Sequence, residues 1–532
     1  MAVDCPRILD CISSPADLKV LSDDELTILA REIREEIIAT TSRNGGHVAS
    51  SLGAVEIILA VHSLIDSPRD RFIFDVGHQA YAHKLVTGRA ENFSTLRKLG
   101  GLSGFPRPDE SPHDVHPSGH ASDSLSIALG LAKARELRGT DEKIVALIGD
   151  ASLAGGMAFE ALNMIGQLQL PLVIVLNDNE MSISRNVGAL VKHLSAMRTS
   201  PMYRMARDTT QAKLERSGPV GKAIVTIGRN MKESVKQFII PHAMMFEQLG
   251  IVCTPPVDGH DIPALREILA QALATDGPVL VHAVTRKGAG YAPAEADPER
   301  FHGLGPYDIA TGKCAVAPSA APTYTQVFGD AIVREAQADP RVVAITAAMT
   351  GGTGLTRFAR EMPNRLVDVG IAEENAVGMA VGLALGGAKP VVAIYSTFLQ
   401  RAFDQIVTDD GLACADVVFA VDRAGLVGDD GATHHGIYDI AYLRMIPGMR
   451  VLAPSDEAEL VHALHTALAL EGPVAVRYPR GAACGVPVPD EPQILPEGIS
   501  RTVREGDDVA ILAFGSMVAR SCEAADLLSQ HV

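Results

Sequence analysis

The fold is decided by two stretches, KIVALIGD at residues 143–150 and LVIVLNDN at residues 172–179. Each is a short aliphatic run that ends in polar residues and lies between segments with helical periodicity. A run that is apolar on both faces is typical of a buried parallel strand between helices. Six further runs of this kind occur, at residues 279–284, 342–345, 391–394, 417–421, 474–476 and 509–512. The sequence therefore predicts an α/β protein with doubly wound parallel sheets.

The length and the charge limit the class of protein. A chain of 532 residues is too long for one hydrophobic core, so we expect about three folding units. Hydrophobic residues make up 47% of the chain and charged residues 21%, which is ordinary for a soluble globular protein. The net charge of −17 argues against nucleic-acid binding, which usually requires a basic surplus.

The cysteines and the apolar stretches bear on location. Seven cysteines are scattered along the chain without a C-x-x-C pair, a pattern that fits a reducing cytoplasm. The polar N-terminus carries no signal-peptide pattern, and the most apolar long stretch, residues 376–395, is interrupted by Gly386, Gly387, Lys389 and Pro390. We therefore expect a cytoplasmic protein without a membrane span.

Helix signals and linkers divide the chain. Ser22 and Glu25 have the spacing of a capping box, and the apolar residues that follow predict an amphipathic helix to about Thr41. A stretch rich in Pro and Ala at residues 315–323 predicts a linker, and a second linker lies near residues 490–497. We expect domains at residues 1–314 and 315–493, and the start of an incomplete third α/β domain at residues 494–532.

A basic insertion interrupts the first predicted domain at residues 185–240. Residues 185–236 hold eleven Lys or Arg against three Asp or Glu, in an otherwise acidic chain. A mobile lid over an anionic site and a solvated helical excursion both fit this composition. The sequence does not decide between them.

The clearest chemical signal lies at two predicted strand ends. Asp150 ends the first stretch and Asn179 ends the second, and the carboxyl ends of adjacent parallel strands are where α/β sheets bind ligands. Carboxylate and amide oxygens are hard ligands that suit Mg²⁺, whose remaining positions a diphosphate and a backbone carbonyl can fill. A Gly-Asp pair at a strand end is also common as a simple turn. Only the polar residues at the end of the second stretch, Asn177-Asp178-Asn179, make a metal site the better interpretation.

A second signal is the segment GIAEEN at residues 370–375. A carboxylate in such apolar surroundings has its charged form disfavoured and can share a proton with a ring nitrogen. The alternative is a Glu placed at a helix N-terminus by the helix dipole, which would account for Glu373 or Glu374 without catalysis. Five histidines flanked by Gly, suited to proton transfer near neutral pH, add a third signal: His47, His78, His120, His302 and His435.

These motifs resemble those of thiamine-diphosphate enzymes, whose metal motif is Gly-Asp-Gly followed by Asn after a similar spacer. From about residue 40 to residue 515 the chain is similar, block after block, to the 1-deoxy-D-xylulose-5-phosphate synthase family; the blocks include GGHVASSLGAVEI, DVGHQAYAHKLVTGR, GDASLAGGMAFEALN, LNDNEMSISRNVGAL, YSTFLQRAFDQ and GATHHGIYDIAYLR. Two departures stand out. Ala151 replaces the third Gly of the metal motif, and Glu374-Asn375 replaces the usual Gln-His.

The resemblance implies a transferase that condenses pyruvate with glyceraldehyde 3-phosphate, with loss of carbon dioxide, in isoprenoid and thiamine biosynthesis. It implies thiamine diphosphate and Mg²⁺ as cofactors, a homodimer, and no nucleic-acid or membrane partner. Domain 1–314 would then bind the diphosphate and Mg²⁺, and domain 315–493 the pyrimidine ring.

The resemblance also implies the site residues. The metal ligands would be Asp150, Asn179 and the carbonyl of Met181. The residues that face the cofactor would be His78, Gly119, His120, Ala121, Ala151, Ser152, Asn179, Lys287, Tyr291 and Glu373. The remaining catalytic and substrate-binding residues would be His47, His302, Tyr395, Arg401, Arg423, Asp430, His434 and Arg480. For Arg401 an exposed helix charge, and for Arg480 a turn position, are the simpler interpretations.

Two other functions stay open at this stage. A transketolase-like ketol transferase would use the same cofactor without releasing carbon dioxide. A non-catalytic protein that keeps the cofactor pocket would fit Ala151, Glu374-Asn375 and the short third domain. Pyruvate dependence and carbon dioxide release discriminate among the three.

Overall fold

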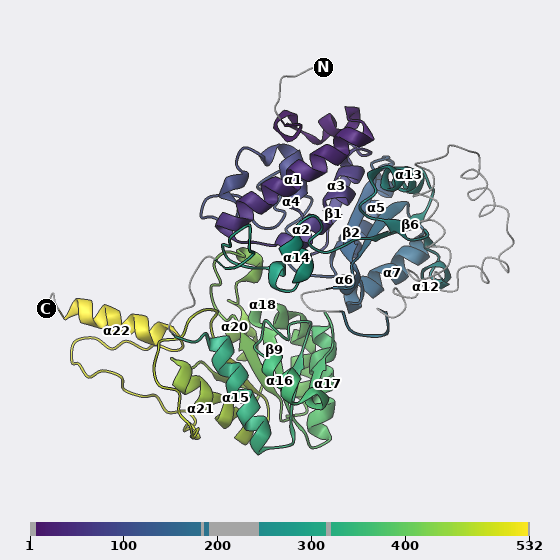
Figure 1. The fold of residues 1–532 in the computed structure, drawn as a ribbon. Helices are drawn as coiled ribbons and strands as arrows, with labels where there is room; N and C mark the ends of the chain where they lie inside the picture. The colour runs from purple at the N-terminus through teal and green to yellow at the C-terminus, as the bar shows by residue number, and fades with distance from the viewer. Residues whose placement is uncertain (1–6, 182–185, 191–243, 315–320, 530–532) are drawn as a thin grey trace. The chain divides into compact units, whose positions relative to one another are not determined.

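The computed structural model describes residues 7–181, 186–190, 244–314 and 321–529. The chain divides into two compact units, Met1–Val316 and Ala317–Val532 (Figure 1). The limit predicted at residues 314–315 lies close to this division.

The first unit contains a parallel sheet with the strand order β1-β2-β3-β6-β4, in which β5 also pairs with β6. Its strands are β1 (Arg71–Phe74), β2 (Ile144–Gly149), β3 (Leu172–Asp178), β4 (Val252–Cys253), β5 (Val257–Asp258) and β6 (Pro278–Val284). The runs predicted at residues 144–148, 172–176 and 279–284 are confirmed as β2, β3 and β6. Because every pair is parallel, the carboxyl ends of these strands meet at one edge of the sheet.

Helices surround this sheet. They are α1 (Asp23–Asn44), α2 (Val48–Gly53), α3 (Val55–His62), α4 (Tyr81–Lys84), α5 (Ser124–Arg138), α6 (Asp150–Leu153), α7 (Gly156–Leu168), α12 (Met244–Gln248), α13 (Ile262–Leu273) and α14 (Ala292–Ala296). Shorter helical turns are η1 (Leu9–Cys11), η2 (Pro15–Val20), η3 (Leu85–Arg89), η4 (Phe93–Thr95) and η5 (Arg300–His302). The predicted capping box at the start of α1 is confirmed: the Glu25 N–H donates to Ser22 Oγ at 3.3 Å, and the Ser22 N–H donates to the Glu25 carboxylate at 2.7 Å.

The core of the first unit has two layers, one on each face of the sheet. In β3, Val173 and Val175 belong to a cluster with residues of α1, α3 and α13, while Ile174 belongs to a cluster with residues of α5 and α7. Successive side chains of a strand point to opposite faces, so this alternation means that both faces are buried. The unit is therefore doubly wound, as the sequence predicted.

The second unit contains a second parallel sheet with the order β11-β12-β10-β9-β7-β8. Its strands are β7 (Val342–Thr346), β8 (Leu366–Asp368), β9 (Lys389–Tyr395), β10 (Val418–Asp422), β11 (Arg450–Leu452) and β12 (Val474–Arg477). Its helices are α15 (Tyr324–Ala338), α16 (Thr356–Glu361), α17 (Glu373–Leu385), α18 (Ser396–Leu399), α19 (Phe403–Gln405), α20 (Asp439–Leu443), α21 (Glu457–Ala469) and α22 (Met517–Leu528), with the short turns η6 (Pro363–Arg365), η7 (Gln400–Ala402), η8 (Ile406–Gly411) and η9 (Ala432–His434). The α/β fold class with two parallel sheets is thereby confirmed.

One predicted strand is wrong. Residues 509–512 form no strand, and Val509 and Leu512 are 69% and 96% exposed. A strand needs a neighbour that accepts its backbone hydrogen bonds and covers its apolar face. Among the described residues no strand pairs with this segment, and α22 is the only helix that follows it.

Several features fall outside the predictions or outside the described residues. The basic insertion predicted at residues 185–240 lies outside the described residues except for residues 186–190. Cys11 takes part in a disulfide that the scattered cysteines did not predict, so the cytoplasmic location stays a prediction. Within the described ranges, no helix is both long enough and apolar enough to cross a membrane.

Candidate active site

The predicted metal ligands lie at the carboxyl ends of β2 and β3. Gly149 is the register partner of Asn177, so Asp150 and the Asn177–Asn179 turn leave the sheet side by side. The carboxylate of Asp150 accepts the N–H of Ala151 at 2.9 Å and that of Glu180 at 2.8 Å, and Asn179 Oδ1 accepts the N–H of Met181 at 3.1 Å. The turn after β3 is thereby bonded directly to the end of β2.

The electrostatics of this edge fit a cation. Burial and the adjacent Asp178 carboxyl together raise the pKa of Asp150 to about 8, and burial has the larger effect. Asp178 also accepts a hydrogen bond from His282 Nε2 at 2.8 Å, and both side chains are buried. Two acidic groups crowded together in this way are stabilised when a divalent cation lies beside them.

The oxygen donors also suit Mg²⁺ in kind. Carboxylate, amide and backbone carbonyl oxygens are the ligands that it prefers. The described residues contain no group of three or more His, Cys, Asp or Glu side chains arranged for a metal, so Asp150 would depend on amide and backbone oxygens as its fellow ligands. Ala151 lies in α6 and has no positive φ, so its methyl group brings none of the backbone strain that a left-handed residue would carry.

Three histidines predicted for the site lie together in the first unit. The His47 ring centroid lies 5.8 Å from that of His78 and 5.9 Å from that of His302, and the His78 and His302 centroids are 5.2 Å apart. Lys287 Nζ hydrogen-bonds His302 Nδ1 at 3.1 Å. Burial lowers the pKa of Lys287 to about 8, against the opposing effect of Asp150. The structure thus joins four predicted site residues into one group of proton-transfer side chains.

The segment that carries Gly119, His120 and Ala121 is held from its C-terminal side. Asp75, which follows β1, accepts the N–H of Ser122 at 2.9 Å and the hydroxyl of Ser124 at 2.7 Å. The Ser122 hydroxyl donates to the carbonyl of Ser152 at 2.7 Å. The segment is therefore connected directly to Ser152.

Tyr291 is placed differently from the other predicted cofactor residues. Its hydroxyl donates to the carbonyl of Ile309 at 2.7 Å, and its ring packs against Phe301 and Tyr307. Tyr291 belongs to the hydrophobic core of the first unit, and its predicted contact with the cofactor stays a prediction.

In the second unit, Glu373 is the first residue of α17 and is 3% exposed. Its Oε2 lies 3.6 Å from Arg401 Nη1. Burial raises the pKa of Glu373 to about 7, Arg401 opposes the rise, and Glu374 adds to it. Arg401 is thus not a simple exposed helix charge, because it pairs with the buried carboxyl that the sequence singled out.

Tyr395 and Arg423 form a second group at the carboxyl ends of β9 and β10. The guanidinium of Arg423 lies over the Tyr395 ring, 3.8 Å from its centroid. Burial raises the pKa of Tyr395 to about 12 and that of the adjacent Asp422 to about 6. Arg423 has a φ of 57°, and its N–H donates to Asp422 at 2.6 Å. Arg423 is therefore held in an uncommon backbone conformation beside the ring.

The other predicted residues of this unit lie after β10 and β12: Asp430 and His434 follow β10, and Arg480 follows β12. Arg480 Nη1 lies 3.4 Å from Asp430 Oδ2 and also donates to the carbonyl of Val427. The His434 ring lies 5.6 Å from that of Phe398, which stacks on Tyr395 at 5.8 Å. Phe398 thus connects His434 to the group of Tyr395 and Arg423.

Comparison with known proteins decides the family. The family model described as 1-deoxy-D-xylulose-5-phosphate synthase matches residues 9–285, and the model described as transketolase, pyrimidine binding domain, matches residues 320–485. A 1-deoxy-D-xylulose-5-phosphate synthase of Pelotomaculum thermopropionicum is 53% identical over 99% of this chain and 82% of its own length. A second, from Geobacter sulfurreducens, is 52% identical over 98% of this chain and 82% of its own length. The chain belongs to the 1-deoxy-D-xylulose-5-phosphate synthase family.

The resemblance seen in the sequence is thereby confirmed, and with it a place among thiamine-diphosphate-dependent, transketolase-like enzymes. Among solved structures, a transketolase from Leishmania mexicana matches 86% of this chain and 77% of its own, with 18% identity and a TM-score of 0.39.

Several residues of this 1-deoxy-D-xylulose-5-phosphate synthase family member were not predicted from the sequence. Asp178 lies beside Asp150, and Asp75 holds the segment after Gly119. Asp422 accepts the N–H of Arg423, and Phe105 packs on His47 with ring centroids 5.2 Å apart. Asp75, Asp178 and Asp422 each end or follow a parallel strand, which is the signal that found Asp150. For Phe105 the sequence offers no such signal, because its neighbour lies 58 residues away along the chain.

Proposed function

We propose that this chain condenses pyruvate with D-glyceraldehyde 3-phosphate, with loss of carbon dioxide, to give 1-deoxy-D-xylulose 5-phosphate. The observation that carries the proposal is the 53% identity over 99% of the chain to a relative of that name. The two groups of buried acids, histidines and arginines at the carboxyl edges of the sheets are the kinds of side chain that such a reaction needs.

The proposed cofactors are thiamine diphosphate and Mg²⁺. When bound, thiamine diphosphate supplies an electron sink for the carbon that loses carbon dioxide. Asp150, Asn179 and the carbonyl of Met181 would hold the metal ion. The residues proposed to face the cofactor are His78, Gly119, His120, Ala121, Ala151, Ser152, Lys287 and Tyr291. The adjacent carboxyl groups of Asp150 and Asp178, whose oxygens are the kind of ligand that Mg²⁺ prefers, support the proposed metal site.

Glu373 is proposed to exchange a proton with a ring nitrogen of the cofactor. With a pKa of about 7, its carboxyl is populated in both protonation states near neutral pH. A carboxyl with an ordinary pKa would be fully ionised there and would hold a proton poorly. Arg401 stabilises the ionised form and so keeps the proton removable.

The arginines and histidines are proposed to handle the substrates. Arg423 and Arg480 have planar guanidinium groups that bind phosphate through paired hydrogen bonds. Tyr395 and Asp430 would hold these two arginines in place, through the cation–π contact and the ion pair described above. His47, His302 and His434 would move protons during condensation and product release.

The assembly is proposed to be a homodimer. Helix α17 carries Met379 and Leu385, which are 42% and 73% exposed, and nearby Leu412 is 77% exposed. In the other unit, Phe159 and Met164 of α7 are also partly exposed. Apolar surface of this kind supports association with a second copy of the chain. Size-exclusion chromatography with light scattering, which measures the molar mass of the eluting protein, would test this. The domain roles at residues 1–314, 315–493 and 494–532, and the cytoplasmic location, stay predictions.

Calorimetry and an assay for carbon dioxide test the proposal together. The protein is titrated with thiamine diphosphate and Mg²⁺, and carbon dioxide release from pyruvate is then measured with and without glyceraldehyde 3-phosphate. Release that depends on both substrates, with formation of the five-carbon product, supports the proposal. Ketol transfer without pyruvate would indicate a transketolase-like enzyme instead, and cofactor binding without any turnover would indicate a binding protein.

A further inference from the structure

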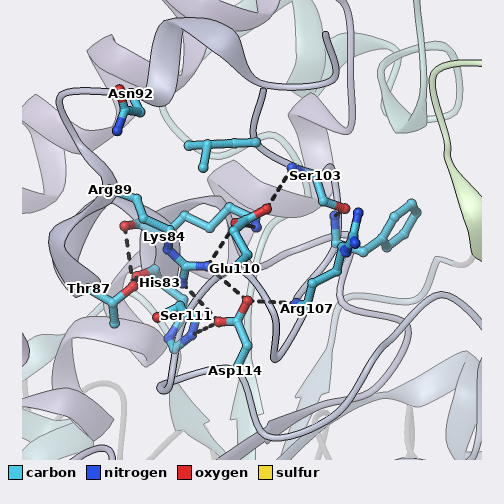
Figure 2. Close-up of polar contacts among 12 residues, drawn as sticks. His83, Lys84, Thr87, Arg89, Asn92, Ser103, Arg107, Glu110, Ser111 and Asp114 are labelled. Carbon is cyan, nitrogen blue, oxygen red and sulfur yellow. Dashed lines mark hydrogen bonds and ion pairs between the residues drawn. The ribbon is translucent and has the colours of Figure 1, made fainter. Parts of the chain in front are cut away.

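The first unit contains a cluster of buried charges that the proposed chemistry does not use (Figure 2). Two cations, Lys84 at the end of α4 and Arg89 at the end of η3, meet two anions, Glu110 and Asp114. Arg89 lies 2.9 Å from Glu110 and 2.8 Å from Asp114, and Lys84 pairs with Glu110. The side chains of Lys84 and Asp114 are fully buried. We call these four residues the charge cluster.

Histidine side chains fix the orientation of one anion in the charge cluster. His83 Nε2 lies 2.9 Å from Asp114 Oδ1, and His62 Nε2 lies 2.8 Å from His83 Nδ1. Burial lowers the pKa of His83 to about 4, so the ring is neutral and its Nε2–H donates to Asp114. The charges of the cluster therefore balance as two positive against two negative.

The charge cluster holds a loop by its backbone. The N–H of Ser103 donates to Glu110 Oε2 at 2.8 Å, and the N–H of Arg107 donates to Asp114 Oδ2 at 2.7 Å. Figure 2 shows both bonds running from the loop into the cluster. Residues 103–107, here called the tethered segment, lie in no helix or strand, so these side-chain bonds replace the regular hydrogen bonds that such elements supply.

The tethered segment touches the candidate active site at several points. The Phe105 ring centroid lies 5.2 Å from that of His47. Pro106 packs so closely on Gly77, the residue before His78, that a Cβ added there would lie 2.4 Å from its Cδ. The carbonyl of Pro106 accepts the N–H of Ser118, the residue before Gly119, at 3.3 Å. Two anchored ends thus bracket the two residues that touch the site.

We propose that the charge cluster is a positioning device for the reaction: it fixes the tethered segment so that Phe105 holds the His47 ring in its working orientation. Buried ion pairs contribute little net stability compared with apolar residues of the same volume, because the charges lose their hydration. They do impose one geometry, since each charge must keep its partners. This inference rests on the proposed function for the role of His47, whereas the tethering itself does not.

A matched pair of substitutions separates positioning from stability. Asp114→Asn removes the charge that anchors Arg107. Asp70→Asn is the control, because Asp70 is a carboxylate as buried as Asp114. It also accepts two backbone N–H groups, from Asp66 at 2.7 Å and from Lys143 at 2.8 Å. Asp70 directly precedes β1, whereas the site residue His78 follows β1. Hydrogen exchange of the tethered segment, kcat, KM and the Kd of thiamine diphosphate are measured for each variant.

We expect Asp114→Asn to speed exchange in the tethered segment and to lower kcat about 10- to 100-fold, because small misplacements of a catalytic group carry losses of that order. The Kd of the cofactor should change less than about threefold, and Asp70→Asn should lower kcat less than about threefold. Normal kcat with a loosened tethered segment would overturn the proposal. So would an equal loss of kcat in Asp70→Asn.

A second route covers the case in which Asp114→Asn does not fold. Glu110→Gln changes the more exposed anion, and Phe105→Leu keeps apolar volume but removes the ring against His47. The two substitutions are also combined in one double variant. If the charge cluster acts through Phe105, the kcat of this double variant falls no further than that of the less active single variant. Losses that multiply would overturn the proposal. An inactive wild type would instead reject the proposed function, and the exchange measurement would still test the tethering.

Discussion

Replacing Glu373 by Gln keeps the size of the side chain and removes its ability to ionise. The buried carboxyl has its pKa raised from 4.5 to about 7, mainly by burial. Because the pKa in the folded state lies above that of the unfolded chain, the contribution of Glu373 to the stability of the wild type is complete below a pH of about 4.5. This contribution is lost as the pH rises through about 7. The Gln variant has no such loss.

The size of the effect follows from the shift in pKa. Raising the pKa of Glu373 from 4.5 to about 7 corresponds to about 3 kcal/mol, because each tenfold change in the ionisation constant corresponds to about 1.36 kcal/mol. The free energy of unfolding of Glu373→Gln, relative to wild type, should therefore increase by about 3 kcal/mol between pH values of about 4 and about 8. The pKa of about 7 already includes the effect of Arg401, which opposes the rise, so the pairing needs no separate correction in this free energy.

Urea unfolding of the cofactor-free protein, followed by circular dichroism at several pH values, measures this difference; the chain has no Trp to report by fluorescence. Glu471→Gln is the control, because Glu471 is exposed in the same unit and its surroundings change little on unfolding. A difference between Glu373→Gln and wild type that stays constant from acid to alkaline pH would refute the raised pKa. The proposed proton exchange would then lose its physical basis.

Four further predictions concern other residues. Glu373→Ala should abolish carbon dioxide release while calorimetry still detects binding of thiamine diphosphate and Mg²⁺, and retained activity would contradict the role of Glu373. The affinity for Mg²⁺ should increase as the pH rises from about 7 to about 9, because the pKa of Asp150 is about 8 and its ionised form binds the cation; calorimetry that shows the same affinity at both values would count against Asp150 as a ligand. Asp410→Asn should gain up to about 6 kcal/mol of stability relative to wild type as the pH rises through about 8, because burial raises the pKa of Asp410 to about 8 and neither of its carboxylate oxygens has a hydrogen-bond partner among the described residues. Unfolding titrations that show no pH-dependent gain would disprove this. Ser22→Ala should destabilise the start of α1 by about 1 kcal/mol in thermal unfolding, and Ser22→Thr, which keeps the capping hydroxyl, should not.

Much of the fold was predictable because its signals are local. Aliphatic runs of three to six residues predicted β2, β3, β6, β7, β9, β10 and β12, and the Ser22 capping box predicted the start of α1. The strands β1, β4, β5, β8 and β11, of two to four residues each, were missed because runs this short seldom carry enough periodicity to distinguish a strand from a loop. The strand expected at residues 509–512 failed for the opposite reason: its local signal was good, but a strand forms only against a neighbour.

By itself the sequence determined where single functional groups lie: Asp150 and Asn179 at the ends of strands, and Glu373 at the start of a helix. Each of these follows from a pattern within a few residues. Only the tertiary structure decided which groups act on one another, such as Asp178 beside Asp150, Arg401 beside Glu373, and Phe105 between the charge cluster and His47. The physical reason is that burial and pairing, which set the pKa values and fix the loop, arise between segments that the chain brings together only when it folds.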